Sequence, residues 1–120
     1  MDIVTESFIN QVKNFIRDLR HLYPKDKIFS VAEYSVKMYA LSNPRELVDT
    51  FKQYLEKYRT EIQNKDESFF LTTEYEFNDS SYTDNIINQL RTKWSVLDSE
   101  NKKSIWLYLK VLLKLADKCT

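Results

Sequence analysis

The only histidine and the only cysteine of the sequence, His21 and Cys119, are the side chains best suited to a nucleophile and base pair. The thiol of such a pair must be held beside the imidazole, but Cys119 is the penultimate residue, and chain ends usually fray. A tetrahedral zinc site would need two carboxylates in addition. We therefore predict an idle terminal thiol, a solvated histidine near a helix end, and no metal site.

Neighbouring carboxylates are the next residues that could do chemistry. Asp66 with Glu67, or Glu74 with Glu76, could act as general acid and base if the two groups were buried close together. Exposed, solubilising acids are the favoured interpretation. The sequence therefore predicts no acid and base site here.

The complete absence of glycine excludes several common active sites. Loops that cradle nucleotide phosphates need glycine for close backbone approach, and the nucleophile elbow of many hydrolases is built around glycines. Calcium loops of the EF-hand type also contain an invariant glycine. We predict a chain with no catalytic residue, no bound cofactor and no enzymatic activity.

Residues 66–84 form the first candidate binding segment, since they contain six acids and no lysine or arginine. Their charge could steer a basic partner, and their aromatic rings could serve as anchors. The alternative is a long connection whose rings complete the protein's own core. The predicted partner-binding residues are Asp66, Glu67, Phe69, Phe70, Glu74, Glu76 and Phe77.

A basic set near the N-terminus is the second candidate surface. Its members are Lys13, Arg17, Arg20, Lys25 and Lys27. The first three follow steps of four and three, so they share a helix face that could meet a phosphate backbone. Nearby acids, the zero net charge and a pI of about 6.6 favour an ordinary solvated face.

The elements that must position these residues are all predicted to be helices. The 120 residues fit one domain, 1–120, and their 42% hydrophobic and 30% charged content is typical of a globular chain. Tight β-hairpins favour Asn-Gly or Asp-Gly turns, which the sequence lacks. The predicted fold is an all-α compact bundle of about five helices with one long acidic-aromatic connection.

Four apolar stripes predict the first helices. The first contains Phe8, Val12, Phe15, Leu19 and Leu22 and ends at Pro24. The second contains Ile28, Val31, Ser35, Met38 and Leu41, with Tyr34 and Tyr39 at its margins. The third follows an Asn43, Pro44 and Glu46 start signal, contains Leu47, Phe51, Leu55, Tyr58 and Ile62, and should end near Asn64. The fourth contains Ile86, Leu90, Trp94 and Leu97.

A fifth helix should begin at a cap formed by Asp98 or Ser99 and lie centrally in the bundle. It is apolar almost all round, so it could equally form the seam of a homo-oligomer. Its most apolar stretch, from Ile105, is interrupted by Lys110 and Lys114, so we expect no membrane span. Trp94 and Trp106 could stack on bases, but their positions beside apolar stripes favour core packing.

The C-terminal half also carries a familiar pattern: Trp94, Leu97, Asn101, Lys102, Ile105, Trp106, Tyr108, Leu109 and Leu112. Asn43, Pro44, Phe51 and Tyr54 belong to it, as does the run of residues 64–70. In these positions, roughly residues 43–116, the sequence resembles small uncharacterised helical proteins of giant nucleocytoplasmic DNA viruses. The resemblance implies a viral protein of the host cytoplasm, the viral factory or the virion, and it implies no biochemical activity.

Together these features predict a non-catalytic helical protein-protein interaction module, a structural or adaptor protein in a viral assembly or replication complex. The single cysteine and the lack of a secretion signal favour an intracellular, reducing compartment. The alternative is a nucleic-acid-binding accessory protein that uses the basic face of the first helix, whose affinity should fall steeply with salt.

Overall fold

Helix α1 (Ile3–Leu22) forms along the first predicted stripe. The computed structural model describes residues 2–68 and 89–119. The Asp2 side chain caps the helix by accepting a hydrogen bond from the Thr5 amide at 2.7 Å. The predicted residues Phe8 and Phe15 are buried, together with Val12 and Leu19. The helix ends before Pro24, as the sequence predicts.

Helix α2 (Lys27–Ser42) exists where predicted, but the prediction of its core side was wrong. Its buried residues are Phe29, Ala32 and Val36, whereas the predicted core residues Val31, Met38 and Leu41 are exposed. The small side chains of Ala32 and Val36 let α2 lie against its neighbours. Apolar spacing alone could not identify this side, because α2 carries apolar residues on more than one face.

The predicted third helix is divided into α3 (Pro44–Lys57) and α4 (Arg59–Gln63), with Tyr58 between them. The start signal is confirmed: the Glu46 amide donates to Asn43 at 3.2 Å, and the Asn43 side chain donates to the Glu46 carboxylate at 2.8 Å. After α4, Lys65 adopts a φ of 52°, in the left-handed region in which glycine is usual, and the chain contains no glycine.

The C-terminal part contains a helical stretch at residues 89–93, the 3-10 helix η1 (Trp94–Val96) and helix α7 (Ser99–Lys118). Asp98 caps α7 by accepting from the Asn101 amide at 2.8 Å, which confirms the predicted boundary. Trp94 and Trp106 are both buried and meet edge to face, with ring centroids 5.6 Å apart. The prediction that both are core residues is therefore confirmed.

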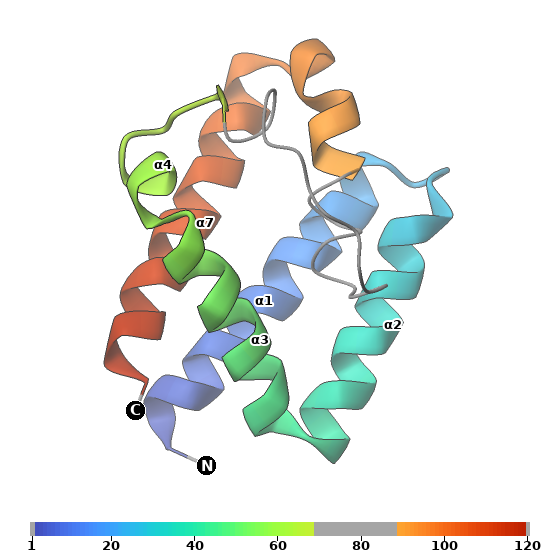
Figure 1. The fold of residues 1–120 in the computed structure, drawn as a ribbon. Helices are drawn as coiled ribbons and strands as arrows, with labels where there is room; N and C mark the ends of the chain where they lie inside the picture. Colours follow the sequence, from blue (N-terminus) through green and yellow to red (C-terminus); the bar gives the residue numbers. More distant parts are fainter. Residues whose placement is uncertain (1, 69–88, 120) are drawn as a thin grey trace.

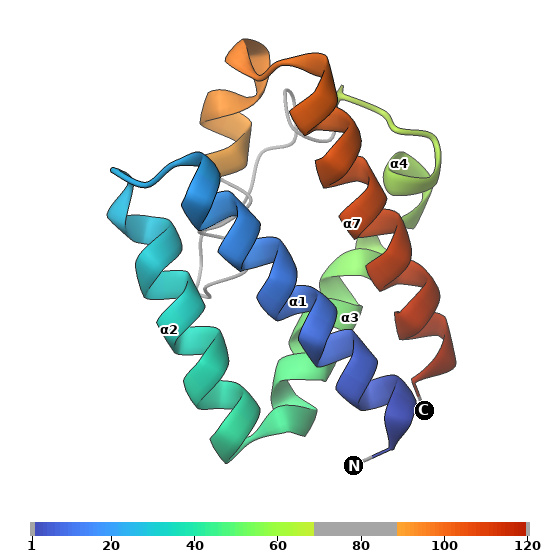
Figure 2. The ribbon, with the colours of Figure 1, turned by 180° about the vertical axis from the view of Figure 1, so that it is seen from behind.

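Helix α1 lies between α2 and α7 and contacts both of them as well as α3. Figure 2 shows α1 in front, with α2 and α7 on either side and α3 behind. Helix α7 also contacts α3 and α4. The two chain ends lie side by side in both views (Figure 1). Every element of the described residues is helical, which confirms the all-α prediction.

Cys119 differs from the predicted frayed thiol. It is buried, its amide donates to the carbonyls of Leu115 and Ala116, and its carbonyl accepts from the Lys52 ammonium at 2.7 Å. These contacts, which link the end of α7 to α3, hold the terminus in place. Among the described residues, none of the helices has the length and apolar character needed to cross a membrane.

Candidate binding surfaces

The acidic-aromatic segment begins with two residues that are held by the protein itself. The Asp66 carboxylate accepts from the Ser68 amide at 3.0 Å, and hydrogen bonds from Ser68 lower the pKa of Asp66. Glu67 accepts from the indole N–H of Trp94 at 3.1 Å and from the ammonium of Lys102 at 3.2 Å. Glu67 therefore ties the chain to η1 and α7, and a partner would have to compete with these bonds.

The other predicted partner-binding residues lie outside the described part of the chain. They are Phe69, Phe70, Glu74, Glu76 and Phe77. The prediction that they bind a partner stays a prediction.

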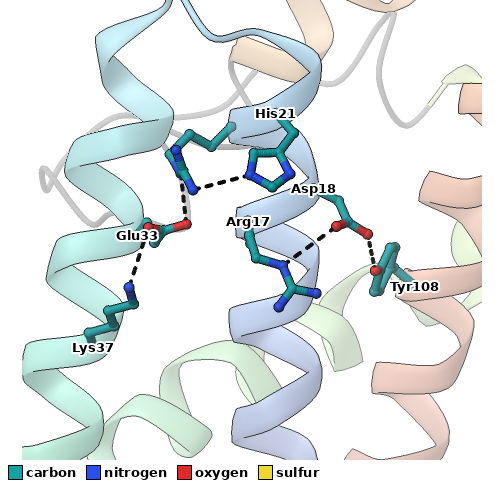
Figure 3. A network of polar contacts seen from close by, with 7 residues as sticks. Arg17, Asp18, His21, Glu33, Lys37 and Tyr108 are labelled. Atoms are coloured by element: carbon teal, nitrogen blue, oxygen red, sulfur yellow. Dashed lines mark hydrogen bonds and ion pairs between the residues drawn. The ribbon is translucent and has the colours of Figure 1, made fainter.

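The basic face of α1 is largely occupied by contacts within the protein. Arg20 makes an ion pair with Glu33 of α2 at 2.9 Å, and Lys37 contacts the other oxygen of that carboxylate at 3.4 Å. Arg17 lies 3.8 Å from Asp18, as Figure 3 shows. Burial raises the pKa of Glu33, but hydrogen bonds from Arg20 and Lys37 lower it by more, so this carboxylate keeps its charge.

The five predicted basic residues therefore do not form one continuous cationic face. Lys25 and Lys27 are exposed at the turn between α1 and α2, while Lys13 is half-buried on α1. At the same turn Asp26 forms an ion pair with Lys93 at 3.1 Å. A phosphate backbone that approached this turn would meet the exposed Lys25 and Lys27 beside the ion pair of Asp26 and Lys93, in which the charges already balance.

A cleft of about 380 Å³ lies between the C-terminal part of α1 and the N-terminal part of α7. Its apolar wall comes from Phe15, Leu19, Leu22 and Ile105, and its polar wall from Asp18, His21, Asn101, Ser104 and Tyr108. The Tyr108 hydroxyl donates to the Asp18 carboxylate (Figure 3), and its ring stacks on Phe15 with centroids 5.0 Å apart. Burial first, and then Asp18, raise the pKa of Tyr108 to about 12.

The polar groups of this cleft do not form an activated site. Because its pKa is raised, Tyr108 stays protonated and serves as a hydrogen-bond donor, not as a base. His21 lies in the last turn of α1, about 27 Å along the helix from its first residue. Figure 1 shows the C-terminal end of α7, which Cys119 follows, near that first turn of α1. No group of three potential metal ligands occurs within residues 2–68 and 89–119.

The surface that the sequence analysis missed lies on α2. Val31, Tyr34, Met38 and Leu41 follow steps of three, four and three, so they share one side of the helix. Their exposed fractions are 62%, 66%, 46% and 82%. We call these four residues the α2 outer face. The spacing that could have revealed a binding surface was assigned to the core instead, because a core stripe has the same spacing.

Comparisons with protein-family models, with curated proteins and with solved structures find no match for this chain. The resemblance to giant-virus proteins therefore stays a prediction.

Proposed function

We propose that the protein is a non-catalytic helical interaction module, a structural or adaptor protein, that binds another protein chain through the α2 outer face. The observation that carries this proposal is the exposure of Val31, Tyr34, Met38 and Leu41 on one side of one helix. Single exposed apolar residues are ordinary, whereas the largest contiguous apolar patch of a monomeric protein, typically about 300–600 Å², is often functional.

The residue types and their spacing support the proposal. Tyrosine and methionine are enriched in protein interfaces, since they offer a large contact area and, for methionine, a shape that adapts. Positions separated by three, four and three are also those by which one helix packs along another. The preferred occupant is therefore a helix with a matching apolar stripe.

The acids of residues 66–84 would give a second point of contact for a basic partner, as the sequence predicts. The nucleic-acid alternative has less support, because Arg20 is paired with Glu33 and Arg17 lies beside Asp18. From the resemblance to proteins of giant DNA viruses, we further propose that the module acts in a viral assembly or replication complex inside the host cell.

Photo-crosslinking from single positions tests this function. A benzoylphenylalanine placed at Tyr34 in the full chain should form intermolecular crosslinks in expressing cells, because it projects from the α2 outer face. The matched control is the same group at Leu107, a 64% exposed residue of α7 away from that face. Equal crosslinking from both positions, or only crosslinks within the chain from position 34, would contradict the proposal.

A further inference from the structure

The pattern of the α2 outer face fits a copy of itself. In a two-fold antiparallel pair of α2 helices centred near Val36, Val31 of each copy lies opposite Leu41 of the other, and Tyr34 lies opposite Met38. Each contact then joins a smaller or flexible side chain to a larger one. The same patch serves both copies, as an isologous interface requires.

The borders of the stripe allow two copies to come close. By helical position its two sides are formed by Ser30, Ser35, Lys37 and Ser42, and its N-terminal end by the exposed Lys27. The three serines are small and uncharged. The ammonium of Lys37 is already 3.4 Å from the Glu33 carboxylate, so the Lys37 and Glu33 side chains of the two copies balance one another. The chain as a whole has a formal net charge of zero, so no long-range repulsion opposes the association of two copies.

The area of the α2 outer face sets the expected affinity of one copy for another. The 16 residues of α2 extend about 24 Å, and a patch on the order of 400 Å² is roughly half of the area that each partner contributes to a standard interface. Interfaces of this size are weak, so a dissociation constant on the order of 100 µM is expected.

We infer that the chain self-associates as a weak two-fold dimer through antiparallel packing of the α2 outer face. This inference rests on the proposed function and names a second copy as the partner. The antiparallel arrangement places Val31 against Leu41 of the other copy, whereas a parallel pair would place each residue against its own equivalent.

A charge-pair rescue tests both the dimer and its direction. Val31→Glu puts an acid in the N-terminal half of α2, and Leu41→Lys puts a base in its last turn, so both changes suit the helix dipole and α2 should still form. Each single variant should weaken self-association at least about tenfold, because a charge is buried against an apolar residue. An equimolar mixture of the two variants should form hetero-dimers with a dissociation constant within about threefold of the wild-type value. In each hetero-dimer the introduced acid meets the introduced base at one end of the helix pair. The other end keeps a contact between Val31 and Leu41.

The measurement is sedimentation velocity of the full chain over a concentration series reaching about 1 mM, with helical content checked by circular dichroism. The wild-type mass should rise from the 14.5 kDa monomer towards twice that value, and Leu107→Glu should behave as wild type. A wild type that stays monomeric, or single variants that associate unchanged, overturns the dimer. Loss in the single variants without rescue in the mixture overturns the antiparallel arrangement.

The two proposals fail in different ways. A monomeric chain that crosslinks from position 34 to a different protein sinks only the self-pairing. The absence of any intermolecular crosslink from that position contradicts the interaction module itself.

Discussion

Helices α2 and α7 are both rich in apolar residues, yet they use them in different ways. Helix α7 buries Ile105, Leu109 and Leu112 among its neighbours, and it contacts α1, α3 and α4. Helix α2 contacts α1 and α3 and lies at the edge of the bundle (Figures 1 and 2). The residues of the α2 outer face are exposed. The comparison teaches that apolar content predicts a helix, while the number and position of its neighbours decide which apolar residues become core.

The same substitution in the two helices should give the largest difference. Leu112→Ala in α7 removes a side chain that is 1% exposed and should cost about 2–5 kcal/mol of the free energy of unfolding, because it leaves a cavity. Leu41→Ala in α2 removes an exposed side chain and should change stability by no more than about 0.5 kcal/mol. Urea denaturation at a dilute, monomeric concentration measures both. Similar losses in the two variants would show that Leu41 is also core, and would remove the basis of the proposed binding face.

The helices themselves were predictable from the sequence because their signals are local. Asn43 and Asp98 cap the helices that follow them, and each cap depends on residues no more than three positions away. The regular steps of Phe8, Val12 and Phe15 likewise identified the inner side of α1 correctly, since that helix has one clear apolar stripe.

The orientation of α2 was not predictable because it depends on distant parts of the chain. Its inner row, Phe29, Ala32 and Val36, is shorter than the outer row, yet its small members allow close packing on α1 and α3. The burial of Cys119 has the same kind of cause, since Lys52 of α3 holds its carbonyl from a position 67 residues away. The pairing of Arg20 with Glu33, which reduces the predicted basic face, is another contact between helices.

A second prediction tests the inner side of α2 directly. Ala32→Leu enlarges a buried side chain where α2 packs on its neighbours. It should lower the free energy of unfolding by about 1–3 kcal/mol, because the well-packed contact must open to accept the larger side chain. Val31→Leu adds one methylene on the outer side of the same turn and should be nearly neutral. Thermal and urea unfolding of both variants provide the measurement. If Val31→Leu destabilised the protein more than Ala32→Leu, the side of α2 that carries Val31 would be the packed side, and the assignment of inner and outer sides would be wrong.

The smallest expected effects concern the polar contacts by which α1 holds these two helices, and they should differ in pH dependence. Arg20 of α1 pairs with Glu33 of α2. Burial raises the pKa of Glu33, but the hydrogen bonds and charges of Arg20 and Lys37 outweigh that effect, so the pKa lies below its ordinary value of 4.5. A lowered pKa in the folded state contributes stability above about pH 4.5 that is lost as the pH falls below that value. Glu33→Gln should therefore flatten the acid side of the stability profile.

Asp18 of α1 instead accepts a hydrogen bond from Tyr108 of α7, whose pKa is raised from 10.0 to about 12 by burial and then by that carboxylate. A raised pKa contributes stability that is complete below pH 10 and is lost as the pH rises from 10 to about 12. Tyr108→Phe should lower the free energy of unfolding by roughly 0.5–1.5 kcal/mol near pH 7, and it should reduce the loss of stability with rising alkaline pH. Part of the loss that remains is due to Tyr23, whose pKa is raised by burial and then by Asp98. Urea unfolding of wild type and both variants over a pH series separates the two contacts, because only Tyr108→Phe removes a group that titrates on the alkaline side. If Glu33→Gln reduced the alkaline slope as much as Tyr108→Phe, α2 and α7 would not be held to α1 by independent polar contacts, and the contrast between them would reduce to apolar packing.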